Sequence, residues 1–229
     1  MSVVIGIINK NFAVMSSDSL TYTGYRTDDK NVIVKYAEPK SFTYPKIFSN
    51  DKIGIIGGVC GIMDVDGKGI IEKITDIINE NSHHNHIDIV RHKLIQGIYR
   101  KLLAEPVENV SKLLELTLIS KEDNDFELYY YRFIPVDGDR IDIIQREYRS
   151  TKELKNENKF IFMTMGSGWK PAFTHLQKQM PIKPDKDYFH KICIESINES
   201  IKNCDPHPYA VPNSPSCGGE PNVIFFNHV

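Results

Sequence analysis

The stretch that decides the fold runs from Ser2 to Asp18 and reads SVVIGIINKNFAVMSSD. Its first apolar run, Val3 to Ile8, is rich in β-branched residues, and a second run covers Phe12 to Met15. The polar turn Asn9-Lys10-Asn11 separates the two runs. Two strand-like runs joined by a short polar turn are typical of a β-hairpin. We therefore expect an opening hairpin whose first strand begins at Ser2 and whose second strand ends at Asp18.

The remainder of the chain alternates between strand-like and helix-like segments. Apolar residues repeat at helical spacing over 70–78 and 87–102, and two further helical segments are expected over 169–179 and 188–203. Strand-like runs are expected at 31–36, 47–48, 53–56, 114–120, 126–134, 140–148, 160–165 and 222–227. Strand runs that alternate with helix pairs favour a layered α+β domain. We expect two sheets packed face to face with the helices outside.

Composition limits the classes of function. The 229 residues fit one domain, which we take to span 1–229. With 28 basic and 30 acidic residues, the net charge of −2 gives no electrostatic grip on nucleic acid. No apolar stretch approaches the ~20 residues of a membrane span, and the first residues lack a signal-peptide pattern. The four cysteines show no zinc-binding spacing, so we expect a cytoplasmic protein with reduced thiols and no metal or cofactor.

Ser2 is the first candidate for chemistry. Removal of Met1 is expected because the second residue is small, and it would leave Ser2 with a free α-amine. Such an amine has a pKa of about 7.7–8.0 and can act as a base near neutral pH. One residue then supplies both the nucleophile and the general base. Many cytoplasmic proteins also begin with Met-Ser, so an ordinary N-terminus remains open at this point.

Asp18 and Lys46 are candidate charge partners for Ser2. A carboxylate at the end of a strand, such as Asp18, can orient a lysine, although it also suits a turn or a cap. Lys46 precedes the apolar pair Ile47-Phe48. A buried cation beside Asp18 would lower the proton affinity of a nearby amine and hydroxyl. A solvated lysine at a strand edge is the alternative.

Two glycine-bearing segments are candidates for the rest of the site. We expect Gly57-Gly58 to end a strand, where a backbone N–H can approach a substrate carbonyl as an oxyanion donor. A tight turn that needs glycine is the structural alternative. Gly166-Ser167-Gly168 follows another apolar run and places the Ser167 hydroxyl where a strand meets a helix.

Taken in order, these segments resemble the proteasome β-subunit and HslV-type N-terminal-nucleophile (Ntn) hydrolases. The spacing from Ser2 to Asp18 matches the opening hairpin of that family without a gap. The other matching segments are Pro45-Lys46-Ile47-Phe48, Ile53 to Gly61, Met165 to Gly168, and the helix from Ser196 towards Asp205. The resemblance covers most of the chain in the family's order.

The resemblance implies a four-layer αββα sandwich and a threonine/serine-type peptidase. Ser2 would be nucleophile and base, Asp18 and Lys46 its charge partners, and Gly58 the oxyanion donor. Ser167 and Asp205 would support the N-terminus. Family members work as self-compartmentalised rings, so the resemblance also implies a homo-oligomer, an ATPase unfoldase as partner, and peptides or unfolded proteins as substrates.

The sequence departs from the family at three places, and other functions stay open. The nucleophile is serine where threonine is commoner. Extra residues at 20–45 leave Lys30 or Lys35 as substitutes for Lys46. Residues 206–215 separate Asp205 from Ser216 and Cys217, either of which can be its companion. The alternatives to a peptidase are a catalytically inactive, proteasome-like assembly subunit and an Ntn amidohydrolase that acts on a small metabolite.

Overall fold

The structure is a computed structural model that describes residues 2–22, 26–28, 30, 32–61, 64–65, 68–84, 86–104, 114–136, 140–179 and 185–227. Within these residues, four α-helices lie in two pairs that are separated along the chain. They are α1 (Ile70–Asn81), α2 (Ile87–Leu103), α4 (Trp169–Gln177) and α5 (Lys186–Asn203). All four of the expected helical segments are confirmed. No helix in the described ranges is long and apolar enough to cross a membrane.

Two antiparallel sheets make up the centre of the molecule. The five-stranded sheet has the order β13-β12-β11-β8-β7. Its strands are β7 (Ile47–Asn50), β8 (Ile55–Gly61), β11 (Leu114–Glu122), β12 (Asp125–Pro135) and β13 (Ile141–Ser150), the last leading into a short 3-10 helix, η1 (Thr151–Glu153). The four-stranded sheet has the order β14-β1-β2-β15. Its strands are β1 (Val3–Ile8), β2 (Phe12–Ser17), β14 (Ile161–Gly166) and β15 (Asn222–Asn227).

The opening hairpin expected from the sequence is confirmed and lies at the centre of the four-stranded sheet. β1 pairs with β2 on one side and with β14 on the other. Every residue of β1 and β2 is buried, because one face of this sheet packs on helices and the other on the second sheet. The apolar character of both strands, without polar alternation, follows from this burial on two faces.

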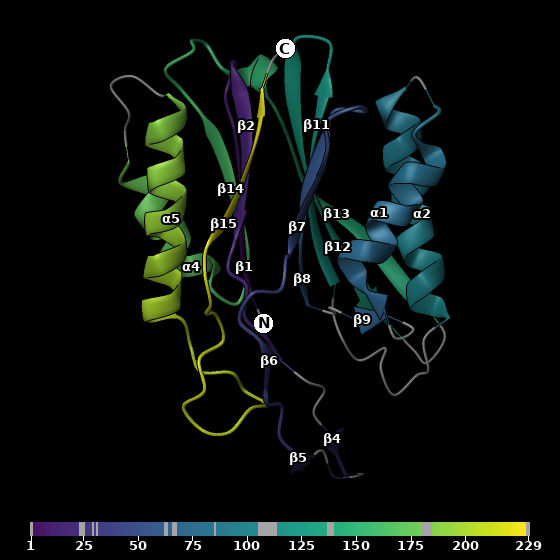
Figure 1. Cartoon of the computed structure of the whole chain (residues 1–229), viewed down its shortest axis with the longest axis vertical. Helices are drawn as coiled ribbons and strands as arrows, with labels where there is room; N and C mark the ends of the chain where they lie inside the picture. The colour runs from purple at the N-terminus through teal and green to yellow at the C-terminus, as the bar shows by residue number, and fades with distance from the viewer. Residues whose placement is uncertain are drawn as a thin grey trace.

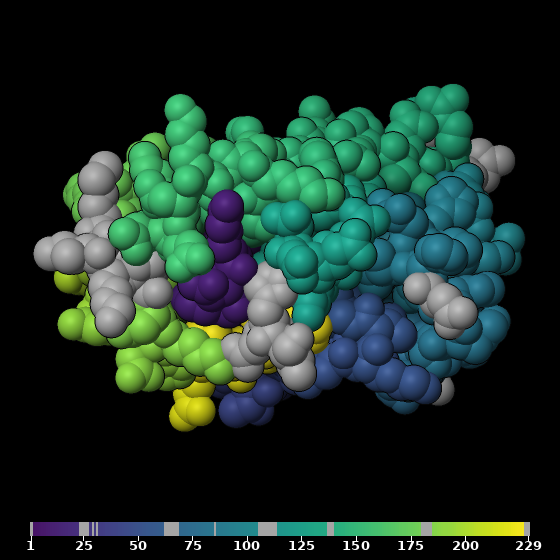
Figure 2. All heavy atoms as spheres, turned by 90° about the horizontal axis from the view of Figure 1, so that it is seen from above, coloured from purple at the N-terminus to yellow at the C-terminus, as the bar shows by residue number. Residues whose placement is uncertain are grey.

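The two sheets lie face to face, with one helix pair on each outer surface (Figure 1). Three buried apolar clusters fill the spaces between these layers. One joins α1 and α2 to the five-stranded sheet, one fills the space between the sheets, and one joins α4 and α5 to the four-stranded sheet. Viewed from the end in Figure 2, the purple opening hairpin lies between the light-green α4–α5 side and the blue α1–α2 side.

One expectation about the five-stranded sheet is wrong. Gly57-Gly58 was expected to end a strand, but β8 continues through both glycines to Gly61. Gly58 pairs with Ile47 of β7 and with Thr117 of β11. A Cβ atom at Gly58 would lie 2.6 Å from Val4 Cγ1 of the facing sheet. Glycine is needed here because the two sheets approach closely.

Residues 20–45 and residues 206–215 are the two segments at which the sequence departs from the family. They pack against each other near the start of β1. Residues 20–45 form short strands in two small sheets: β3 (Thr21–Tyr22) with β6 (Pro39–Ser41), and β4 (Arg26–Thr27) with β5 (Ile33–Lys35). Ala37 N donates a hydrogen bond to Tyr209 O of the second segment at 2.7 Å. Figure 1 shows both segments below the main body, on the side where the N-terminus is marked. The remaining short pair is β9 (Asp64–Val65) with β10 (Lys68–Gly69).

Candidate active site

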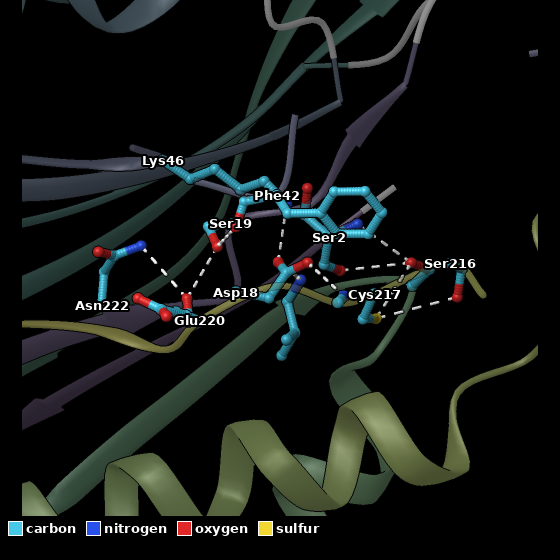
Figure 3. A network of polar contacts seen from close by, with 12 residues as sticks. Ser2, Asp18, Ser19, Phe42, Lys46, Ser216, Cys217, Glu220 and Asn222 are labelled. Atoms are coloured by element: carbon cyan, nitrogen blue, oxygen red, sulfur yellow. Dashed lines mark hydrogen bonds and ion pairs between the residues drawn. The ribbon is translucent and has the colours of Figure 1, made fainter. Parts of the chain in front are cut away.

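The Asp18 carboxylate joins three separate parts of the chain. Its Oδ1 accepts hydrogen bonds from Val3 N at 2.9 Å and from Lys46 Nζ at 2.8 Å. Its Oδ2 accepts a hydrogen bond from Gly218 N at 3.0 Å. Asp18 comes directly after β2 and is completely buried, so all these bonds are shielded from water. Figure 3 shows Asp18 between Lys46 and the segment that carries Ser216 and Cys217.

Lys46 is the lysine that meets Asp18. It directly precedes β7, and its side chain is completely buried, like that of Asp18. Burying an unpaired charge is very unfavourable, so the two charges depend on each other. Lys30 and Lys35, the substitutes left open by the sequence, are both exposed. The structure thus brings together Asp18 and Lys46, as the sequence predicted.

Ser2 lies at the start of β1, next to this ion pair. Its side chain is buried, and its Oγ has no hydrogen-bond partner among the described residues. Ser2 N donates to Ser167 Oγ at 3.2 Å, and Ser2 O accepts from Ser167 Oγ at 3.3 Å. Gly168 N also donates to Ser2 O, at 3.2 Å. The register of β1 with β14 explains these contacts, because Val3 lies opposite Gly166.

The turn that carries Ser167 is held from the facing sheet by Glu115. Glu115 Oε2 accepts a hydrogen bond from Gly166 N at 3.0 Å, while Oε1 accepts one from the Tyr130 hydroxyl at 2.7 Å. Gly166 has a φ of +85°, and a Cβ there would lie 2.1 Å from Ser2 O. Glu115 was not among the site residues predicted from the sequence. The available signal was an acidic residue within an apolar strand, on the opposite face from Leu114 and Leu116.

Two of the predicted site residues do not take the roles expected of them. Gly58 is in the middle of β8, with strands on both sides, and not at the strand end where we expected an oxyanion donor. Asp205 is exposed, and no hydrogen bond joins it to Ser167 within the described residues. Asp205 lines a surface cavity that Ser167 also borders.

The residues that follow 206–215 lie beside Ser167, where Asp205 was expected. Ser216 and Cys217 are completely buried. Cys217 Sγ lies 3.9 Å from Ser167 Oγ, and Gly218, the next residue, donates to Asp18. An antiparallel bridge between Pro206 and Pro215 closes the intervening loop and brings Ser216 and Cys217 back to the site.

Cys60 is another nucleophilic side chain near this cluster. It lies on β8, and a Cβ at Gly166 would be 2.8 Å from its Sγ. Burial raises the pKa of the Cys60 thiol well above its usual value. The thiol therefore stays protonated near neutral pH and is a poor nucleophile. The open hydroxyl of Ser2 is the stronger candidate.

The arrangement suits acyl transfer by an N-terminal residue. Three groups lie at one end of β1: a hydroxyl with no partner in the described part of the chain, a backbone nitrogen on the same residue, and a buried lysine paired with aspartate. These are the groups needed for a nucleophile, its base and an electrostatic partner. Comparison with known proteins does not assign a class, since the chain matches no protein-family model and no curated protein.

Proposed function

We propose that this chain is an Ntn hydrolase of the proteasome β-subunit and HslV type that cleaves peptide bonds through Ser2. The observation that carries the proposal is the contact of Ser2 N with Ser167 Oγ beside the buried Asp18–Lys46 pair. The order of layers, helices–sheet–sheet–helices, supports the four-layer αββα assignment. The Ser2 hydroxyl has no hydrogen-bond partner among the residues that the structure describes, which supports its role as nucleophile.

In the proposed reaction, loss of Met1 converts Ser2 N from a backbone amide into an α-amine. Ser2 Oγ attacks the carbonyl carbon of the substrate, and the α-amine takes the hydroxyl proton. The amine then passes a proton to the leaving amino group, which leaves an ester on Ser2. Water, activated by the same amine, hydrolyses this ester and regenerates Ser2. Ser167 positions the amine, and the positive charge of Lys46 favours the deprotonated form of the hydroxyl.

The resemblance extends the proposal to the setting of the reaction. We infer a cytoplasmic, homo-oligomeric ring that receives unfolded protein from an ATPase unfoldase. A ring encloses the nucleophile and limits cleavage to chains that are threaded into it. Light scattering on the full chain tests this extension, because a strictly monomeric protein contradicts it.

The catalytic proposal is tested by intact mass together with active-site labelling. The probe is a peptide electrophile that requires both a hydroxyl and an α-amine on the same residue. The purified chain is expected to lack Met1 and to be labelled at Ser2. Ser2→Ala is expected to abolish labelling and peptide hydrolysis. Ser120→Ala is the matched control, because Ser120 is also a buried serine whose hydroxyl has no partner among the described residues.

The other outcomes separate the competing functions. Retention of Met1 contradicts the proposed catalytic function and favours an inactive, proteasome-like assembly subunit. Labelling of Ser2→Ala at the parent rate removes Ser2 as the nucleophile. Hydrolysis of small amides without hydrolysis of peptides points to an amidohydrolase that acts on a metabolite.

A further inference from the structure

A cavity between α4 and α5 is lined mainly by charged and polar side chains. Its volume is about 450 Å³, which lies within the range of small-molecule sites, about 300–1,000 Å³. Both helices pack on the outer face of the four-stranded sheet (Figure 1). Ser200 Oγ on α5 donates a hydrogen bond to Gly168 O, at the start of α4, at 2.9 Å. The two walls of the cavity are therefore held in place by the core beneath them.

The charges of the lining are divided between the two walls. Lys170 on α4 and Lys178, directly after it, belong to one wall. Glu199 on α5 and Asp205, shortly after it, belong to the other. A cationic wall thus faces an anionic wall across the cavity.

Within the described residues, no ion pair crosses this cavity. Glu199 Oε2 accepts a hydrogen bond from Asn203 Nδ2 of its own helix at 3.0 Å. His175, a third ionisable group on the cationic wall, lies 3.7 Å from Glu195, which is outside the cavity. The two lysines and Asp205 form no ion pair with any described residue. Charges of opposite sign therefore face each other across a gap that a ligand can fill.

A ligand that carries both charges suits these two walls. An apolar molecule would take the charged groups out of water without giving them a partner. An anion is repelled by Glu199 and Asp205, and a cation is repelled by Lys170 and Lys178. A zwitterion meets each wall with the opposite charge.

We propose that this cavity binds a small zwitterion with an ammonium and a carboxylate, of the size of a free amino acid or a dipeptide. The carboxylate lies against Lys170 and Lys178, and the ammonium lies against Glu199 and Asp205. Thr174, which lines the same cavity, adds a hydroxyl that can donate to the carboxylate. Contacts between exposed charges are individually weak, so we expect a dissociation constant in the range of about 1–10 mM.

Binding in this cavity acts on the candidate active site through Ser167. Ser167 borders the cavity, and its Oγ lies 3.2 Å from Ser2 N and 3.3 Å from Ser2 O. Peptide hydrolysis releases fragments whose two ends are an ammonium and a carboxylate. The ligand therefore belongs to the chemical class of the product, and its binding feeds back on Ser2. This link rests on the proposed function, whereas the binding itself does not.

An NMR titration of the full chain measures the binding and needs no enzymatic activity. The zwitterionic probes are alanine and alanyl-alanine. N-acetyl-alanyl-alanine keeps only the carboxylate, and alanyl-alanine amide keeps only the ammonium. The amide signals of residues 167–178 and 199–205 are expected to shift and saturate with the zwitterions, and the tighter of the two gives the size of the ligand. Each capped dipeptide is expected to bind at least about threefold more weakly than alanyl-alanine.

Two pairs of substitutions test the walls separately. Lys170→Gln with Lys178→Gln removes the cationic wall, and Glu199→Gln with Asp205→Asn removes the anionic wall. Each pair is expected to weaken the binding of the zwitterions at least about threefold. Loss of the anionic wall should strengthen the binding of N-acetyl-alanyl-alanine, because its carboxylate is no longer repelled. Lys202→Gln is the matched control, since Lys202 is an exposed lysine of α5 that does not line the cavity.

The remaining outcomes decide the proposal. It is overturned if neither zwitterion gives a saturable shift up to about 50 mM. Capped dipeptides that bind as tightly as alanyl-alanine also overturn it, as do wall variants that bind like Lys202→Gln. Unchanged labelling of Ser2 at saturation overturns only the link to the active site. A parent chain that is not labelled at Ser2 at all contradicts the proposed function, and the titration still decides the cavity.

Discussion

Glu115 Oε2 and Gly166 N are joined by a 3.0 Å hydrogen bond that runs from the five-stranded sheet to the turn beside Ser2. Glu115 also accepts a hydrogen bond from Tyr130 and lies 3.3 Å from Arg132 Nε. One side chain thus holds the turn of one sheet against two strands of the other. The position of Ser167, and through it that of Ser2 N, depends on this bond.

Substitution of Glu115 is expected to loosen this turn. Glu115→Ala leaves the N–H of Gly166 and the hydroxyl of Tyr130 without their acceptor and should lower the free energy of unfolding by about 2 kcal/mol. Glu115→Gln keeps one acceptor oxygen and should lose about half as much. Urea denaturation measures both changes.

A surface glutamate provides the control for Glu115. Glu147 on β13 is 40% exposed, so Glu147→Ala should change the free energy of unfolding by less than about 0.5 kcal/mol. Equal effects of the Glu115 and Glu147 substitutions would show that the Gly166 contact does not stabilise the fold.

Removal of the Lys46 charge is expected to be costly. Lys46→Met leaves the completely buried Asp18 carboxylate without its ion partner, which should cost about 3–5 kcal/mol. Asp18→Asn removes the other charge, so the double substitution should be less destabilising than the sum of the two single ones. Chemical denaturation of the four proteins gives this coupling. Lys52→Met at an exposed position is the control, and strictly additive effects would contradict the pairing.

Gly58→Ala tests the close approach of the two sheets. The new Cβ would lie 2.6 Å from Val4 Cγ1 and 3.1 Å from Ile47 Cγ2, so we expect a loss of about 1–3 kcal/mol. Val4→Ala removes the nearer atom and should partly restore stability when combined with Gly58→Ala. A double variant as unstable as the sum of both changes would rule out this explanation.

His207 is expected to make the fold sensitive to acid. Burial lowers the pKa of His207 to about 4, from 6.5 in an unfolded chain. As the pH falls below 6.5, the unfolded chain takes up the proton first, so stability is lost between pH 6.5 and about 4 and levels off below that. Protonation also opposes the hydrogen bond that Tyr209 N donates to His207 Nδ1 at 3.1 Å.

His207→Asn keeps an acceptor near the position of Nδ1 but cannot be protonated in this range. The loss of stability between pH 6.5 and 4 is therefore expected to be smaller than in the parent. Thermal unfolding at a series of pH values measures the difference. His86→Asn, at an exposed histidine, is the control. It should lose as much stability between pH 6.5 and 4 as the parent does.

The sequence predicted the elements better than the contacts between them. The hairpin of β1 and β2 and the four helices were predictable because each has a clear local pattern of apolar residues. The role of Gly58 was not, because a Gly-Gly pair is also a turn signal, and its real cause is a Val4 side chain in the facing sheet. Such crowding is a property of the tertiary structure alone.

The same limit applies to the site. Asp18 was predictable from its unbroken spacing to Ser2 within one hairpin. The choice of Lys46 over Lys30 and Lys35 depended on the path of the inserted strands, and periodicity does not determine that path. Asp205 was predicted from the family resemblance, with Ser216 or Cys217 as its companion. No local pattern in the sequence marks the bridge between Pro206 and Pro215, which returns Cys217 to the site.

The Asp18 carboxylate also sets the order of events during synthesis. It is satisfied by the residue after Ser2, by Lys46 and by Gly218, which follows it by 200 positions in the chain. A nascent polypeptide cannot complete this junction until Gly218 has left the ribosome. The surroundings of the proposed nucleophile are therefore completed late, after the segment that carries Gly218 has been made.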